Sequence, residues 1–398
     1  MSVLFGRSER RTATAPWSSG GSSRGAWRSL SGEKVTFSTV IGLDAVAAVV
    51  GLICDVVYML PLATYRDEGG VPVRLPSPPL VAEPSGTIDP RAWRAQAVMS
   101  WMLWGNAYGL ITSRDSRQRV TGVDWLNPEW VDVDEPWGVL GPATYRLNGR
   151  EIAEDQLLHL PGRYVRTGYR QGLVPLERFR ETFGLAAAAR NYGARWFGEG
   201  AHPSAILQTK EPVSAEQAAT IKERFLAAVR GRREPAVLGA GVQYTSVQEG
   251  PEQSQLVASQ QHAAVAVARA LGLLQPEMIG AAIAGSSVTY ANREQRAIDF
   301  LTFSADPYLV RLEDAITRQL ATAQGGSTPE TGQYVRLTRD ALLRTDTKSR
   351  YEAHEVAIRS GWRTPNEVRR LEDEQPLAEG GDRTNWPPFA VTPAKETS

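Results

Sequence analysis

The first long run of apolar residues in the chain predicts a helix over residues 40–59. Asp44 and Asp55 interrupt the run eleven positions apart. Because eleven residues are almost three helical turns, both acids fall on one face, and the other faces are apolar. Pro61 ends the helix, since proline cannot continue the backbone hydrogen-bond pattern. The pattern therefore indicates an amphipathic helix that buries its apolar faces.

The next segment alternates between turn signals and short apolar stretches. Seven prolines over residues 61–90 favour a tethered loop that carries one short strand at Tyr65-Arg66 before a turn at Gly69-Gly70. Asp89 and Pro90 are a helix N-cap and first helical residue. A helix is predicted from there to Trp104, followed by strands at 107–112, 120–126, 131–133 and 145–152, the last folded at Asn148-Gly149. This region is predicted to be a small mixed α/β unit.

The second half of the chain is mainly helical. Two Ala-rich helices, 176–197 and 252–273, bracket an insert with the pattern strand, helix, strand. Residues 274–289 are Gly-rich and predict a flexible loop. A long helix follows over 290–323, and Pro307 is expected to kink it near Phe303. The last predicted elements are a strand at 334–337, a helix at 347–360 and a helix opened by a capping box at 364–367.

Composition places the chain among globular proteins of two or three domains. Of 398 residues, 42% are hydrophobic and 22% are charged. Lys+Arg and Asp+Glu both total 44, so the formal net charge is zero, which argues against wrapping of nucleic acid by bulk charge. Five of the 44 basic residues are Lys, so the rest are Arg, which favours planar ion pairs. Residues 1–32 and 380–398 are rich in Ser, Gly, Pro or Arg and are predicted to be disordered.

No motif for catalysis is present. The sequence has no phosphate-binding loop of the form GxxxxGK[ST], no GxSxG nucleophile and no HExxH pair. His159, His202, His262 and His354 are scattered and lack metal-ligand spacing, and Cys54 lies inside the apolar helix. We therefore expect no enzyme, no metal and no cofactor. The alternative from another class is a peripheral membrane protein anchored by residues 40–60.

Short motifs along residues 40–382 are more specific than the composition. They are Leu60-Pro61-Leu62 with Tyr65-Arg66, Leu103-Trp104-Gly105-Asn106-Ala107-Tyr108, Leu126-Asn127-Pro128, Leu158-His159-Leu160-Pro161-Gly162, Gly172-Leu173-Val174-Pro175-Leu176, Tyr290-Ala291-Asn292-Arg293-Glu294-Gln295 and Gly361-Trp362-Arg363-Thr364-Pro365-Asn366-Glu367-Val368-Arg369. In this order they resemble the portal proteins of long-tailed, siphovirus-type bacteriophages. Trp104 and Val174 depart modestly from the family pattern.

The resemblance implies an α+β portal fold with a mixed α/β wing, a two-helix stem, a small α/β clip and a helical C-terminal crown. Its parts would be an arm 1–32, wing 33–175, stem helix 176–200, clip 201–250, stem helix 251–273, tunnel loop 274–289, wing 290–345, crown 346–379 and tail 380–398. It also implies a DNA channel at one capsid vertex of the virion, assembled in the host cytoplasm and used for packaging, head assembly and DNA exit through the tail. The implied partners are itself as a homo-oligomeric ring of twelve subunits, the terminase large subunit, the major capsid protein or scaffold, a head-tail adaptor and double-stranded DNA.

Two sets of residues are candidates for contacts within that architecture. Basic residues exceed acidic ones by eight to four between Arg190 and Arg233, and a charged cluster repeated round a ring steers docking. We expect Lys222, Arg230, Arg232 and Arg233 to face a motor or adaptor; a solvated helix end is the other interpretation. Residues 272–292 contain no Lys or Arg, and Glu277 is their one charge. A neutral loop would let DNA slide, so the second candidate set is Glu277, Met278, Ile279, Ile283 and Ser286, which would line the constriction unless they are ordinary core contacts.

Overall fold

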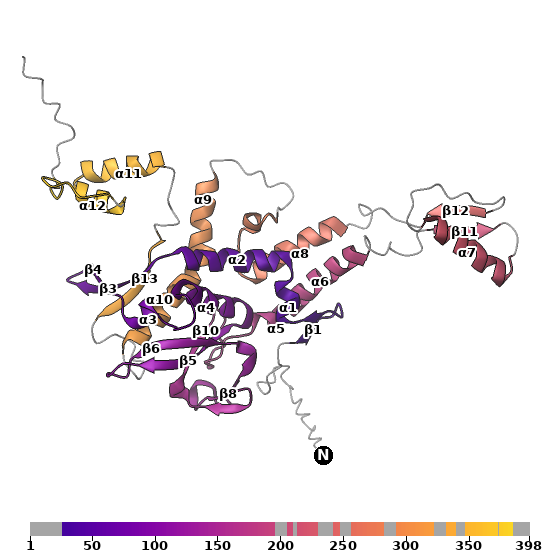
Figure 1. Ribbon diagram of the computed structural model, residues 1–398, viewed down its shortest axis with the longest axis horizontal. Helices are drawn as coiled ribbons and strands as arrows, with labels where there is room; N and C mark the ends of the chain where they lie inside the picture. The colour runs from indigo at the N-terminus through magenta and orange to yellow at the C-terminus, as the bar shows by residue number, and fades with distance from the viewer. Residues whose placement is uncertain are drawn as a thin grey trace, which may run out of the picture.

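The computed structural model describes residues 26–195, 205–209, 213–229, 242–246, 256–281, 292–321, 332–339, 347–372 and 374–384. The chain forms an elongated molecule with a central α/β body (Figure 1). Helices α6 (Arg180–Arg195) and α8 (Leu256–Ala270) extend from this body toward a small α/β unit at one end. Helices α11 (Thr347–Arg359) and α12 (Pro365–Leu371) lie at the other end. The observed architecture is mixed α+β, as the sequence predicted.

The core of the body is a layer of helices packed against antiparallel sheets. It contains α1 (Phe37–Ile41), α2 (Asp44–Met59), α3 (Pro79–Ala82) and α4 (Pro90–Trp104). Helix α2 packs against α4 and α8, and its buried side chains include Val46, Val49, Val50, Ile53 and Val57. Asp44 and Asp55 are both exposed, as the predicted amphipathic pattern requires. None of the helices in the described ranges is long and apolar enough to cross a membrane. Since α2 buries its apolar faces within the protein, the alternative of a membrane anchor at residues 40–60 is not supported.

The sheets of the body are small and all their strands pair antiparallel. They are β10–β5–β6, β7–β8–β9 and β13–β3–β4, and a short hairpin β1–β2 precedes them. Their bounds are β1 Trp27–Arg28, β2 Lys34–Val35, β3 Leu62–Glu68, β4 Val71–Leu75, β5 Asn106–Arg114, β6 Val120–Leu126, β7 Val131–Asp134, β8 Thr144–Leu147, β9 Arg150–Ile152, β10 Leu157–Pro161 and β13 Gln333–Leu337. Short 3-10 turns η1 (Pro128–Trp130), η2 (Gly138–Leu140) and η3 (Glu154–Gln156) connect strands of this region.

Two predicted irregular segments contain regular structure. Residues 61–90, predicted as a loop with one strand, form the β3–β4 hairpin and helix α3, because β3 pairs with the distant strand β13. The predicted disordered arm does not include Trp27–Gly32. There, strand β1 pairs with β2, Ser29 is buried, and the Leu30 amide donates to Glu181 of α6 at 2.8 Å.

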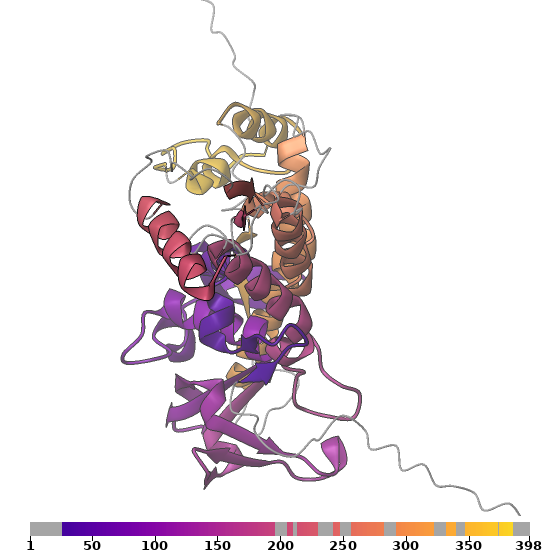
Figure 2. The same ribbon diagram turned by 90° about the vertical axis from the view of Figure 1, so that its right-hand side faces the viewer.

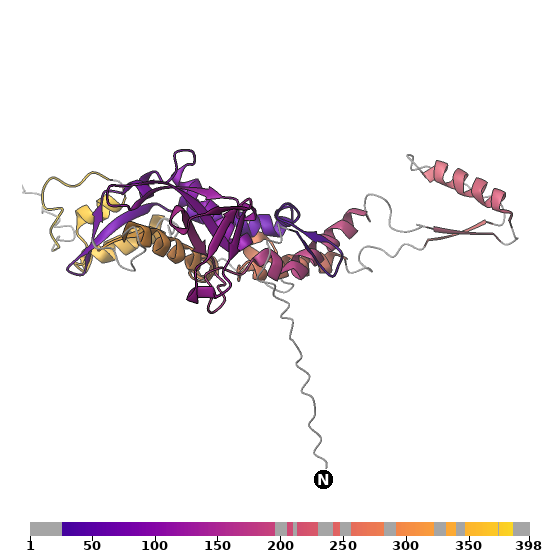
Figure 3. The same ribbon diagram turned by 90° about the horizontal axis from the view of Figure 1, so that it is seen from below.

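The two Ala-rich helices lie side by side and point toward the small α/β unit (Figures 1 and 3). The first consists of α5 (Pro175–Arg178) and α6 (Arg180–Arg195), separated at Phe179, and the second is α8 (Leu256–Ala270). The small unit contains β11 (Ala205–Thr209), α7 (Ala215–Val229) and β12 (Val242–Ser246), with β11 antiparallel to β12. The predicted pattern of strand, helix, strand is therefore confirmed.

The long C-terminal helix is continuous but locally widened before Pro307. It runs through α9 (Asn292–Asp299), the π-helical segment η6 (Phe300–Ala305) and α10 (Asp306–Ala321). Proline has no N–H to give to the carbonyl four residues earlier, and the Asp306 amide instead donates to Leu301 five residues back. The predicted distortion near Phe303 is present and takes the form of this π-turn.

The C-terminal unit is built by α11 (Thr347–Arg359) and α12 (Pro365–Leu371). The predicted capping box is formed: the Glu367 amide donates to Thr364 at 3.2 Å, and the Thr364 amide donates to Glu367 at 2.8 Å. The segment after residue 380 was predicted to be disordered, but its first residues are placed. The amide of the buried Asn366 donates to Gly381 at 2.8 Å, and its side-chain NH2 donates to Asp382 at 3.1 Å.

Candidate functional site

The paired helices α6 and α8 form the candidate stem, and small side chains line the seam between them. Ala186 and Ala189 on α6 face Ala263 and Ala264 on α8 across a cavity of about 310 Å³ that also reaches the start of α2. Small alanine side chains allow the backbones of neighbouring helices to approach closely, and α6 and α8 are in contact. Arg190 of α6 donates to the Gly42 carbonyl at 2.8 Å and so ties the stem to the α1–α2 junction.

Part of the stem surface is apolar and uncovered in a single chain. Leu185 on α6 and Val257 on α8 are each 56% exposed. The isolated chain therefore exposes aliphatic side chains on both helices of the candidate stem.

The candidate tunnel loop begins with a defined turn. The 3-10 turn η5 (Pro276–Ile279) contacts α2 and α8, and Gly280 ends it with φ +75°. Met278 is 39% exposed, Glu277 is half-buried, and Ile279 is half-buried and packs against the main core. Ile283 and Ser286 lie outside the described residues. Of the three candidates that are described, Met278 presents the most surface.

The candidate docking residues of the clip are described only in part. Lys222 lies on α7, but its side chain is outside the described set, as are Arg230, Arg232 and Arg233 altogether. Residues 213–220 at the start of α7 are all exposed, and the Gln217 amide donates to the Ser214 hydroxyl, just before the helix, at 3.3 Å. The start of α7 is therefore accessible to a partner.

Three of the sequence motifs meet at one buried hydrogen-bonded cluster around Asn106. The Asn106 side-chain oxygen accepts from the Gly172 amide at 2.8 Å and from His159 Nε2 at 2.9 Å. Its NH2 group donates to the Gly172 carbonyl at 2.9 Å, and Tyr145 donates to His159 Nδ1 at 3.1 Å. The cluster holds together the start of β5, the middle of β10 and the segment that leads into the candidate stem.

The electrostatics of this cluster indicate a structural role. Burial and, to a smaller extent, the positive charge of Arg170 together lower the pKa of His159 to about 4. The imidazole is therefore neutral at pH 7, which fits a ring that donates at Nε2 and accepts at Nδ1. Burial also raises the pKa of the neighbouring Tyr108, whose ring stacks on His159 at 4.7 Å between centroids. Neither group is available for acid–base chemistry at neutral pH.

Elsewhere, the described residues offer little reactive chemistry. They contain no group of three or more His, Cys, Asp or Glu side chains that could hold a metal ion. The Cys54 thiol is buried, and desolvation, followed by the charge of Asp55, raises its pKa to about 12. Such a thiol is inert because the thiolate is the nucleophilic form. The sequence analysis did not find the arginines that line the cleft between β13–β3–β4 and α12, since they are far apart in the chain.

Comparison with known proteins defines the class of this chain. A family profile described as "Phage portal protein" matches residues 44–373. The chain therefore belongs to the phage portal protein family, whose members are structural, non-enzymatic components of the virion and form the DNA channel at a capsid vertex. This agrees with the family resemblance of the motifs and with the absence of catalytic motifs.

Individual relatives come from long-tailed phages. The chain is 30% identical over 371 residues to the probable portal protein of Streptomyces phage phiC31, covering 88% of this chain and 78% of the relative. It is 27% identical over 358 residues to the portal protein of Enterobacteria phage HK97, covering 86% and 81%.

Solved structures share the fold. An HK97-family phage portal protein from Corynebacterium diphtheriae matches with a TM-score of 0.55 at 21% identity, covering 78% of this chain and 98% of that one. A chain from the neck of a native gene transfer agent particle, computed with C12 symmetry, matches with a TM-score of 0.57 at 17% identity, covering 85% and 92%. The fold of this chain thus occurs in an oligomeric ring in the neck of a phage-like particle.

Proposed function

We propose that twelve copies of this chain form the portal ring through which a terminase motor packages double-stranded DNA into the capsid. The observation that carries the proposal is family membership over residues 44–373, together with the likeness to a chain in a neck of C12 symmetry. The exposed Leu185 and Val257 on the stem support it, because neighbouring copies in a ring would cover them. The same ring would nucleate head assembly and later serve as the exit for DNA.

In this proposal the clip is the docking site for the terminase large subunit and then for the head-tail adaptor. The four candidate docking residues lie within a short stretch of the sequence; they are Lys222, Arg230, Arg232 and Arg233. Repeated round a ring, they would create a positive field that steers an acidic partner surface. The wing would contact the major capsid protein or scaffold.

The tunnel loop would contact the DNA during translocation. Support comes from its lack of cations between residues 272 and 292 and from the exposure of Met278. A positive charge in every subunit would bind phosphates and resist sliding, whereas a neutral apolar surface does not. Ile279 belongs to the foot of this loop, because it packs on the core.

Electron microscopy of the purified full-length chain tests the proposal directly. Rings of about a dozen subunits with an axial hole are expected, since closed cyclic symmetry buries the stem surfaces of every copy. A compact monomer that also fails to form rings when co-expressed with the capsid protein would contradict the proposal. As a matched test of the interface, Leu185→Glu with Val257→Glu should prevent rings, and Thr112→Glu at an exposed position of β5 should not.

A further inference from the structure

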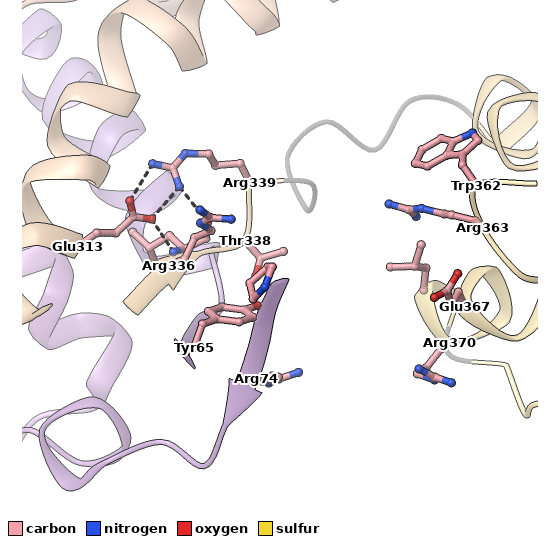
Figure 4. Close-up of a pocket in the computed structure, with 13 residues that line it drawn as sticks. Tyr65, Arg74, Glu313, Arg336, Thr338, Arg339, Trp362, Arg363, Glu367 and Arg370 are labelled. Atoms are coloured by element: carbon pink, nitrogen blue, oxygen red, sulfur yellow. Dashed lines mark hydrogen bonds and ion pairs between the residues drawn. The ribbon is translucent and has the colours of Figure 1, made fainter. Parts of the chain in front are cut away.

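A cleft of about 1200 Å³ separates the β13–β3–β4 sheet from helix α12 (Figure 4). We call it the crown cleft, and its lining residues are Tyr65, Pro72, Arg74, Glu313, Arg336, Leu337, Thr338, Arg339, Trp362, Arg363, Glu367, Arg370 and Leu371. Arg74 and Arg336 come from the sheet, and Arg363 and Arg370 come from the α12 side. Arg74 and Arg363 point from opposite walls into the opening. Guanidinium groups therefore face each other across the cleft.

The carboxylates of the cleft are already engaged. Glu313 accepts from Arg339 at 2.7 and 3.1 Å and from the Leu337 amide at 2.6 Å. Glu367 accepts from the Thr364 amide in the capping box, where the helix N-terminus also stabilises its charge. Glu313 therefore neutralises Arg339, and Glu367 is engaged at the N-terminus of α12. Neither carboxylate pairs with the remaining arginines of the cleft, which are Arg74, Arg336, Arg363 and Arg370.

Arg74, Arg336, Arg363 and Arg370 have no carboxylate partner among the residues that the structure describes. Arg336 lies over the Tyr334 ring at 5.6 Å, and Arg363 lies over the Trp362 ring at 5.1 Å. A guanidinium stacked on an aromatic face keeps its N–H fork available for an anion. The chain as a whole has zero net charge, so four such groups in one cleft are a local concentration of positive charge.

We propose that the crown cleft binds the phosphate backbone of double-stranded DNA. Guanidinium forks match phosphate oxygens in a bidentate geometry, and cations on two walls fit a ligand whose charges repeat along its length. At about 1200 Å³ the cleft also exceeds the size of a typical small-molecule site. This inference rests on the proposed portal function, which brings DNA to the molecule.

The crown cleft contains the positive charge that is absent from the tunnel loop. No Lys or Arg lies between residues 272 and 292, so any cations of this chain that pair with backbone phosphates lie outside that loop. The crown cleft lies at the end of the molecule opposite the clip (Figure 1). In this arrangement, DNA would slide past the neutral tunnel loop. The arginines of the crown cleft would bind the DNA in a salt-dependent way, far from the clip where the motor would dock.

Binding of a fluorescent duplex to purified full-length rings tests the inference. The cleft variant combines Arg74→Gln, Arg336→Gln, Arg363→Gln and Arg370→Gln. The matched control removes the same charge from exposed arginines elsewhere, Arg28→Gln, Arg91→Gln, Arg117→Gln and Arg150→Gln. Because each neutralised phosphate adds about 0.9 to the slope of log K against log salt, the loss of four cations should lower that slope by about 3.6 and weaken binding at least about tenfold. The control should keep the wild-type slope.

Site-specific crosslinking locates the contact. The buried Cys54, with its thiol pKa raised to about 12, does not compete for a thiol reagent, so a single introduced cysteine can carry a photo-crosslinker. Leu371→Cys in the cleft should crosslink to duplex DNA, and Leu140→Cys, which is highly exposed outside it, should not.

Equal salt slopes for the cleft and control variants would overturn the inference. So would a cleft variant that loses binding to poly-glutamate and keeps binding to duplex DNA, since that result identifies an acidic protein segment as the occupant. Failure of the wild-type chain to form rings contradicts the proposed function instead, and electron microscopy of the same samples separates the two failures.

Discussion

His159 donates through Nε2 to the side-chain oxygen of Asn106 at 2.9 Å, and this bond joins two motifs that are separated by more than fifty residues. The same oxygen accepts from the Gly172 amide, so a third motif is held at the same point. Asn106 is 1% exposed. The cluster fixes the segment that enters the stem against the sheet β10–β5–β6 (Figure 2 shows the helices above the sheets).

Replacing Asn106 is expected to destabilise the fold strongly. Asn106→Leu keeps the side-chain volume but leaves the amide and carbonyl of Gly172 without partners in a buried site. Each unsatisfied buried group costs about 1–3 kcal/mol, so the free energy of unfolding should fall by about 3 kcal/mol. Urea unfolding at a fixed protomer concentration measures it. The control Asn191→Leu removes one bond to Glu33 from a partly exposed site and should cost less than about 1 kcal/mol. If both variants lost the same free energy of unfolding, the buried cluster around Asn106 would contribute no more to stability than a partly exposed hydrogen bond.

Stability should depend on pH through His159. Its pKa is lowered to about 4 in the folded chain from an ordinary value of 6.5, so the unfolded chain binds more protons between these values. The neutral imidazole makes its full contribution to the free energy of unfolding above pH 6.5. This contribution is lost as the pH falls from 6.5 to about 4. The free energy of unfolding should fall by about 3 kcal/mol in total over this pH range because of His159. Unfolding at pH 7.5 and pH 4.5 should show that His159→Gln loses less stability on acidification than the wild type. His262→Gln, at an exposed site, should behave as the wild type does.

Gly105 should tolerate no side chain, whereas Gly280 should tolerate a small one. Both have positive φ, +69° and +75°. A Cβ on Gly105 would collide with the backbone carbonyl of Leu173, but a Cβ on Gly280 would meet nothing within 4 Å. Gly280→Ala should therefore cost about 1 kcal/mol of backbone strain, and Gly105→Ala several times that amount. Thermal unfolding of both variants checks this, and similar melting temperatures would contradict the packing of Gly105 against Leu173.

Local signals explain why much of the fold was predictable. The N-cap at Asp89, the turn at Gly69-Gly70, the capping box at Thr364 and the π-turn before Pro307 depend on residues within one or two turns of the chain. Each could be read from the sequence because the physical cause lies next to its effect.

Long-range pairing explains what could not be predicted. Strand β13 pairs with β3 across more than 260 positions, with Leu337 opposite Leu62, and β10 pairs with β5, with Pro161 opposite Asn106. No local pattern specifies such partners. The crown cleft was missed for the same reason, because Arg74 and Arg370 lie at opposite ends of the sequence. The motif around Asn106 was recognised, and its role as the meeting point of three motifs needed the structure.

Arg339 is expected to hold strand β13 on the kinked helix. Its guanidinium pairs with Asp306, next to the π-turn, and with Glu313 about two helical turns further on. Arg339→Met would leave both carboxylates without their cation, at a cost of about 2 kcal/mol. Adding Glu313→Gln should recover part of that loss, because a neutral amide no longer needs the charge. Hydrogen exchange at the Val335 and Leu337 amides reports the local effect, and unchanged protection in the single variant would argue against this role.

Introducing a positive charge at Met278 tests the sliding surface of the tunnel loop. Met278 is exposed, so Met278→Lys should leave folding intact and place one cation per subunit in the channel. A ring of twelve lysines would bind the phosphate backbone, and packaging should slow by an amount that increases as salt is lowered. Ile279→Lys differs, because Ile279 packs on the core and its replacement should lower stability first. Packaging rates for both variants at two salt concentrations, with ring formation checked by electron microscopy, separate a channel effect from a folding defect. Normal packaging by rings of Met278→Lys at low salt would place residue 278 away from the DNA path.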